Sequence, residues 1–265
     1  MTRRVVVRSV LVALLVGRAP CALPQWHPLA SGTPVQLNSI FFRDAVNGYC
    51  VGGGGRVGTP SGDGVVLRTT DGGNTWSTVH TWPDVALIEV VAVHDTVIVY
   101  GRATSFSLRC LSTDGGATWH RDTITYRPFE TTVDQGRVYF IDEATGGLYR
   151  SEGKGVQLVR ANAWHFEARN GRLTVLGPVG AGIGLAWSDD GTNWKTTKVD
   201  VPDLSSRRMS HATVSRNGDT LAFKCTFPST TVFSTDGGAT WASNGNAPEL
   251  ASIMLGPRVQ FGTGP

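Results

Sequence analysis

Four short segments with a common pattern decide the fold: residues 69–76 (TTDGGNTW), 112–119 (STDGGATW), 188–194 (SDDGTNW) and 234–241 (STDGGATW). A fifth segment, 151–155 (SEGKG), keeps the serine and the glycines but lacks the aspartate and the tryptophan. The starts of these five segments are 43, 39, 37 and 46 residues apart, which gives a repeat of about 41 residues. A strand-rich repeat of this length is typical of a β-propeller blade with four strands.

The residue types in each segment predict a tight turn. A hydroxyl at the head and an aspartate two residues later can hydrogen-bond to nearby backbone N–H groups, and the glycines supply conformations with positive φ. We expect each tryptophan ring to be buried beneath its turn. Since an apolar run precedes each segment, the turns should join the third and fourth strands of a blade. The residues assigned to this structural role are Asp71, Trp76, Asp114, Trp119, Asp190, Trp194, Asp236 and Trp241.

The rest of the chain also favours strands. No stretch of ten or more residues has the apolar period of a helix, and 33 of the 265 residues are glycine. The dipeptides Asn47-Gly48, Asn170-Gly171 and Asn217-Gly218 favour hairpin turns. We therefore predict an all-β chain that forms a β-propeller of about six four-stranded blades, within a range of five to seven.

Residues 1–22 are typical of a secretion signal peptide. Three arginines precede the apolar run 9–16 (SVLVALLV), and Ala22 is a suitable last residue before cleavage. The run is shorter than the roughly 20 residues of a membrane-spanning helix, and a buried N-terminal strand is the alternative. We expect a secreted or periplasmic protein, with association to the cell surface as a further option and no transmembrane segment in the mature chain.

Residues 23–265 are expected to form a single propeller domain. Trp26 precedes a strand-like run by the same distance as Trp76 does, so it should open an outer strand that completes the last blade. Residues 251–265 supply only two strands and no further turn segment. We therefore expect an incomplete closing blade, either in a truncated product or in a chain that dimerises or recruits a partner strand there.

The charge balance argues against nucleic acid as a partner. The whole chain has 24 basic and 21 acidic residues, but four arginines and no acidic residue lie in the predicted signal, so 20 basic residues remain against 21 acidic ones. Binding to phosphates needs a basic surplus. Of the cysteines, Cys50, Cys110 and Cys225 remain after cleavage, so at most one disulfide can form. We expect these cysteines to be buried, unreactive thiols, and a single disulfide is the alternative.

The repeated segments resemble the Asp-box, or BNR, repeat, whose pattern is S-x-D-x-G-x-T-W. Together with residues 37–55 (LNSIFFRDAVNGYCVGGGG), they make the chain similar to the Ycf48-like and Vps10/sortilin-like propellers among the WD40/YVTN/BNR-like repeat proteins. The likeness covers residues 26–265. Such families include a photosystem assembly factor, sorting receptors and sialidases, so the resemblance implies a fold and leaves the activity open.

The predicted function is a non-catalytic scaffold that binds a protein or a glycan, with an assembly factor as one form of it. The alternative is a glycoside hydrolase of sialidase-like type, which would need three arginines, a Tyr–Glu pair and an acidic aspartate at the central channel. The sequence shows no such set, and the turn aspartates fall on separate blades, so we expect no catalytic residue, metal site or cofactor.

Two loops carry candidate binding residues. Arg207 and Arg208 lie in a polar loop and are candidate contacts for an acidic partner, although a solvated pair of loop residues is the default interpretation. Arg56 lies in the glycine-rich loop 52–64 (GGGGRVGTPSGDG), whose backbone N–H groups could cradle an anion. A flexible hairpin insertion is the alternative for that loop.

Overall fold

The computed structural model describes residues 29–54, 62–152, 155–201, 213–226 and 229–244. Within these ranges the chain forms twenty β-strands, arranged in five antiparallel sheets of four strands each. No helix in the described ranges is long and apolar enough to cross a membrane. The all-β prediction is confirmed.

Each sheet is a meander in which strands that follow one another in sequence also pair in space. Sheet 1 contains β1 (Leu37–Phe42), β2 (Gly48–Gly52), β3 (Gly64–Thr69) and β4 (Ser77–Trp82). Sheet 2 contains β5 (Ala86–Val93), β6 (Thr96–Arg102), β7 (Ser107–Ser112) and β8 (His120–Ile124). Sheet 3 contains β9 (Pro128–Asp134), β10 (Arg137–Asp142), β11 (Gly147–Glu152) and β12 (Gly155–Arg160).

The last two described sheets have the same plan. Sheet 4 contains β13 (His165–Arg169), β14 (Arg172–Val179), β15 (Gly182–Ser188) and β16 (Lys195–Lys198). Sheet 5 contains β17 (Thr213–Asn217), β18 (Thr220–Thr226), β19 (Ser229–Ser234) and β20 (Ala242–Asn244). The predicted signal 1–22, Trp26 and the predicted closing segment 251–265 lie outside the described residues, so the expected number of blades stays a prediction.

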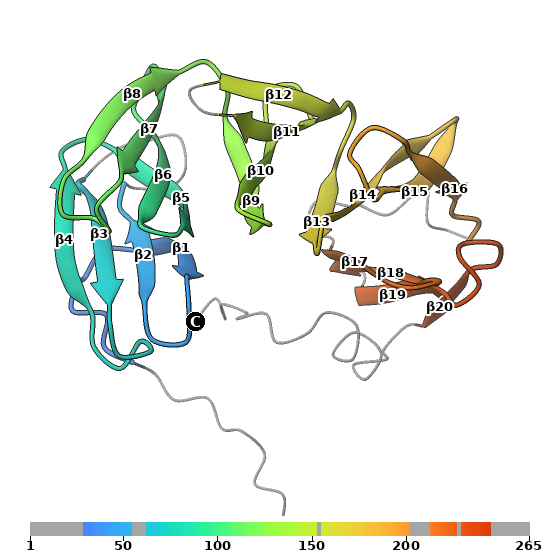
Figure 1. The fold of residues 1–265 in the computed structure, drawn as a ribbon, viewed down its shortest axis with the longest axis horizontal. Coiled ribbons are helices and arrows are strands. Elements are labelled where there is room, and N and C mark those ends of the chain that lie inside the picture. The colour runs from blue at the N-terminus through green and yellow to red at the C-terminus, as the bar shows by residue number, and fades with distance from the viewer. Residues whose placement is uncertain (1–28, 55–61, 153–154, 202–212, 227–228, 245–265) are drawn as a thin grey trace, which may run out of the picture.

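The five sheets follow one another in an arc around a common centre (Figure 1). The first strand of each sheet lies nearest the centre, and the fourth lies at the outside. The first strands contact one another in chain order, β1 with β5, β5 with β9, β9 with β13, and β13 with β17. Residues far apart in sequence therefore meet along the inner strands.

The hydrophobic core lies between neighbouring sheets. Between sheets 4 and 5, for example, Leu176 and Leu185 pack in one cluster with Leu221 and Phe223. Burying a side chain of this size contributes about 1.5–3 kcal/mol. Because a middle strand has a sheet on each side, it is apolar on both faces, and five consecutive residues of β6 are buried (97–101). Outer strands such as β16 are largely exposed.

The repeated segments form the turns between the third and fourth strands. In sheet 2 the Ser112 hydroxyl donates to Asp114 Oδ1 (2.7 Å) and accepts from the Gly116 N–H (2.7 Å). The Asp114 carboxylate accepts from the Thr118 N–H (2.9 Å) and from the Thr118 hydroxyl (2.6 Å). The Ser112 hydroxyl and the Asp114 carboxylate thus bond to groups within the turn.

These turns also bond to the first hairpin of their own sheet. The Gly115 N–H donates to the Asp95 carbonyl (2.9 Å) in sheet 2, and the Gly237 N–H donates to the Asp219 carbonyl (2.8 Å) in sheet 5. The turns that follow the first and the third strands therefore lie at the same edge of the molecule. We call this edge the turn edge, and the edge carrying the other connections the opposite edge.

Two details differ from the sequence predictions. The rings of Trp76, Trp119, Trp194 and Trp241 are only half-buried, because the turns lie at the edge of the sheets; Trp119 Nε1 donates to the Gly116 carbonyl at 3.0 Å.

The Asn-Gly dipeptides also behave differently from one another. Only Asn170-Gly171, of the three, has both residues at positive φ (54° and 79°). Gly48 instead belongs to β2, and the Asn47 N–H donates to the Asp44 carboxylate at 2.7 Å. A side-chain acceptor in the turn has replaced the tight two-residue hairpin that the dipeptide favours.

Candidate functional site

The binding residues predicted from the sequence, Arg56, Arg207 and Arg208, lie outside the described residues. The four turn aspartates belong to four different sheets and are occupied by hydrogen bonds within their own turns. In the described ranges, no group of three or more His, Cys, Asp or Glu side chains is arranged to hold a metal ion.

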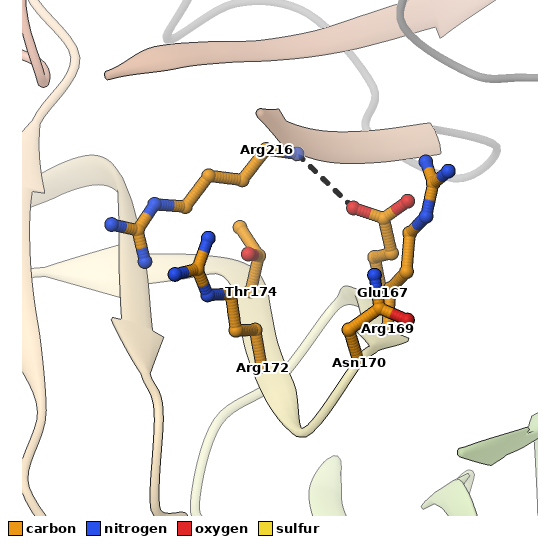
Figure 2. Close-up of a pocket in the computed structure, with 6 residues that line it drawn as sticks. All are labelled: Glu167, Arg169, Asn170, Arg172, Thr174 and Arg216. Atoms are coloured by element: carbon orange, nitrogen blue, oxygen red, sulfur yellow. Dashed lines mark hydrogen bonds between the residues drawn. The ribbon is translucent and has the colours of Figure 1, made fainter. Parts of the chain in front are cut away.

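A polar pocket of about 390 Å³ lies at the turn edge, at the junction of sheets 4 and 5 (Figure 2). Its lining comes from β13, from the turn that follows it, from β14 and from β17. The lining residues are Glu167, Arg169, Asn170, Arg172, Thr174 and Arg216. Three of the six carry a guanidinium group, so we call this the arginine pocket.

Glu167 fastens the two inner strands at the base of the pocket. Its side chain belongs to β13 and is buried. The Arg216 backbone N–H on β17 donates to Glu167 Oε2 at 3.1 Å, which is the dashed line in Figure 2. Because one partner is a backbone group, this bond sets the position of β17 against β13 without using the Arg216 guanidinium.

The Arg216 guanidinium is held by its surroundings. It lies over the Trp187 ring, with Cζ 5.2 Å from the ring centroid, and its Nε donates to the Gly218 carbonyl at 3.2 Å. Arg216 Nη1 is buried and has no hydrogen-bond partner among the described residues. A buried donor without an acceptor is unfavourable, and the nearest carboxylate oxygen, Asp189 Oδ1, lies 3.8 Å from Nη1.

The other two arginines are more exposed. Arg172 Nε lies 3.1 Å from Asp189 Oδ1, and both of these side chains are more than half exposed. Arg169 is exposed and has no ion-pair partner in the described part of the chain. Guanidinium groups present several N–H donors in a plane and match carboxylates in pairs of hydrogen bonds. The arrangement can therefore bind an acidic group.

A second pocket, of about 420 Å³, lies at the opposite edge beside sheet 2. Its lining includes Phe106, Arg102 and Arg127. Arg102 is paired with Glu143, so the positive charge here is partly neutralised, and Arg127 is the exposed cation of this pocket.

Carboxyl groups also gather on the inner strands. Glu89 on β5 accepts from the Thr131 hydroxyl on β9 (2.8 Å) and from the Ser39 hydroxyl on β1 (3.4 Å). Burial raises the pKa of Glu89 to about 7. On β9 the bulge residue Glu130 has a positive φ of 53° and lies 2.9 Å from His165 Nδ1. These groups join neighbouring sheets through their side chains.

Two of the three cysteines of the predicted mature chain are described. Cys50 and Cys110 are both free and buried, and burial raises the pKa of Cys50 to about 11 and that of Cys110 to about 12. The prediction of buried thiols is confirmed for these two residues. A thiol with so high a pKa is a poor nucleophile at neutral pH.

Comparison with known proteins places the fold. No protein-family model matches the chain, and no curated protein matches it. Among solved structures, Ycf48 bound to a D1 peptide is 18% identical, with 84% of each chain covered and a TM-score of 0.50. Ycf48 from Cyanidioschyzon merolae is 16% identical over 78% of this chain and 69% of that chain, with a TM-score of 0.53.

The chain is a β-propeller. A GH74 enzyme from Niastella koreensis is also similar, with 18% identity and a TM-score of 0.50, but this propeller spans only 38% of that enzyme. At such identities the likeness carries the fold alone.

The sequence could have indicated part of the arginine pocket. Arg169 and Arg216 each directly precede an Asn-Gly dipeptide, in the segments ARNGR and SRNGD. The two segments are the first hairpins of neighbouring sheets, so equivalent turns present both arginines at one junction. Sequence reasoning treated the dipeptides only as turn signals and left the preceding residues out.

Proposed function

We propose that this propeller is a non-catalytic scaffold that binds an acidic segment of a partner protein in the arginine pocket, as an assembly factor would. The observation that carries the proposal is the clustering of Arg169, Arg172 and Arg216 around one pocket at the turn edge. Glu167 and Asp189 offset part of the charge of the three arginines, and the positive charge that remains favours association with carboxylate-rich chains.

Similarity to a peptide-bound propeller supports a protein segment as the ligand. In that structure Ycf48, which has a related fold, is bound to a D1 peptide. The proposal includes two finer points from the sequence: the turns are Asp-boxes of the BNR type, and residues 1–22 direct the chain out of the cytoplasm. Export would place the pocket in the same compartment as periplasmic or extracellular partners.

The pocket does not favour the hydrolase alternative. A sialidase-like site needs a tyrosine beside a glutamate in addition to three arginines, and the described lining of the arginine pocket contains no tyrosine. Glu167 is bonded to the backbone of the neighbouring strand, which suits a structural carboxylate. Turnover of fluorogenic glycosides by the purified protein would nevertheless overturn the scaffold proposal.

The direct test is binding of a short, fluorescein-labelled oligoglutamate peptide, followed by fluorescence anisotropy at low ionic strength. Arg169→Gln removes the exposed cation that has no ion-pair partner among the described residues, and it should weaken binding by about five- to tenfold. Arg127→Gln is the matched control, because it removes an exposed arginine at the opposite edge. It should change the affinity by less than about twofold.

Two outcomes would contradict the proposal. If the unmodified protein does not bind the peptide, the pocket is not a site for acidic chains. If both variants weaken binding equally, the peptide responds only to overall charge and not to this pocket.

A further inference from the structure

The turn of sheet 4 differs from the other turns at one position. The residue between the head hydroxyl and the aspartate is Thr70, Thr113 or Thr235 in the other three full segments, but it is Asp189 in sheet 4. The turn does not need this carboxylate. Ser188 and Asp190 make the internal bonds, with the Ser188 hydroxyl donating to Asp190 Oδ1 at 2.9 Å and accepting from the Gly191 N–H at 2.8 Å.

Asp189 instead contacts the arginine pocket. Its Oδ1 lies 3.1 Å from Arg172 Nε and 3.8 Å from Arg216 Nη1. One carboxylate oxygen therefore lies between two of the three guanidinium groups that line the pocket. Figure 2 shows these two guanidinium groups on the same side of the opening, with the Arg169 side chain on the other side.

The contact with Arg216 is incomplete. A distance of 3.8 Å is too long for a hydrogen bond, and Arg216 Nη1 has no other acceptor in the described residues. Asp189 thus lowers the positive potential at the two arginines without satisfying the buried donor. Its side chain is 60% exposed, and exposed ion pairs are weak, so an incoming carboxylate can displace it.

We infer that Asp189 is an internal competitor for the carboxylate of an acidic ligand at Arg172 and Arg216. The inference rests on the proposed function and names the ligand group, which is a carboxylate that takes the place of the Asp189 side chain. A ligand gains only the difference between its own interaction with the two arginines and that of Asp189. The pocket is therefore selective for segments with several acidic residues, because one carboxylate must displace Asp189 while another reaches Arg169.

The test uses the oligoglutamate peptide with Asp189→Asn. This variant keeps the shape of the side chain and removes its charge, and we expect binding to tighten by about fivefold. Asp84→Asn is the matched control: it removes one negative charge from an exposed turn between sheets 1 and 2, and asparagine accepts the positive φ of 53° found there. This control should leave the affinity within about twofold.

A double variant locates the effect. When Arg172→Gln is added to Asp189→Asn, most of the gain in peptide affinity should disappear. The reason is that one of the two arginines freed by the loss of the Asp189 charge is then missing. Equal or weaker binding by Asp189→Asn, in a protein whose binding still depends on Arg169, would overturn the competitor role alone. Equal tightening by Asp84→Asn would overturn it as well. Absence of binding by the unmodified protein would overturn the proposed function, and the competitor role with it because that role rests on the proposed function.

Discussion

Carboxylates in two regions of this propeller are hydrogen-bonded, yet their pKa values move in opposite directions. In the turn of sheet 1, hydrogen bonds from the Thr75 hydroxyl and N–H and from the Thr69 hydroxyl hold the pKa of Asp71 at about 2. On the inner strand β5, burial raises the pKa of Glu89 to about 7, although two hydroxyls donate to it.

The difference shows which physical effect dominates in each region. The turn is at the edge, so the Asp71 carboxylate keeps its contact with water while backbone and side-chain donors favour its charged form. Glu89 lies on β5 between β1 and β9, where loss of water and the nearby Glu130 carboxylate both disfavour the charge. Two hydroxyl donors do not offset that loss. The turns therefore hold permanent charges, whereas the inner strands hold one that titrates near neutrality.

The largest expected effect comes from Glu89→Gln. The native pKa lies above the ordinary value of 4.5, so the folded state keeps its proton while the unfolded state loses it, and the free energy of unfolding falls as pH rises from about 4.5 to about 7. A neutral glutamine avoids this loss. We expect the variant to gain on the order of 3 kcal/mol relative to the unmodified protein between about pH 4.5 and about pH 8.

Urea unfolding at the two pH values measures this gain. The control is Glu143→Gln, which removes an exposed carboxylate paired with Arg102 and should show little change between the two conditions. If the free energies of unfolding of Glu89→Gln and the unmodified protein differ by the same amount at both pH values, the carboxyl of Glu89 has an ordinary pKa.

A smaller effect is expected at the heads of the turns. The buried Ser112 hydroxyl donates to Asp114 and accepts from Gly116, and Ser188 makes the same bonds in the shorter turn of sheet 4. Ser112→Ala should lower the free energy of unfolding by about 1–3 kcal/mol, because backbone donors lose a buried acceptor. Ser188→Ala should lower the free energy of unfolding by a similar amount if the shorter turn of sheet 4 is equally stable. Thermal unfolding measures both variants. A loss of stability confined to Ser112→Ala would show that the turn of sheet 4, which is one residue shorter, is already weaker in the unmodified protein.

The smallest expected effect is the titration of a turn carboxylate. Because the folded pKa of Asp71 lies below its ordinary value of 3.8, its stabilising contribution is present above that value and is lost as pH falls through about 2. Carbon-detected NMR of the side-chain carboxyl should show Asp71 still ionised at about pH 3. A midpoint near 3.8 would mean that the hydrogen bonds of the turn do not persist in solution.

Much of the fold could be predicted because it depends on local patterns. The spacing of the repeated segments and the apolar runs before them predicted four-stranded units, and each described full segment does join a third strand to a fourth. Local patterns were less reliable where a side chain competed with the backbone. Asp44 in the first hairpin changed the role of Asn47-Gly48, and the position of the turns at the edge left their tryptophans half-exposed.

The sequence by itself determined the all-β class, the repeat and the residues that close each turn, since these are set by contacts between residues a few positions apart. Only the tertiary structure decided the candidate site. Arg169 and Arg216 are separated by a whole repeat, and they meet because β13 and β17 pack side by side around the centre. The role of Asp189 also depends on tertiary structure. The internal bonds of its turn do not use its carboxylate, and only the packing of sheet 4 on sheet 5 places that carboxylate between two arginines.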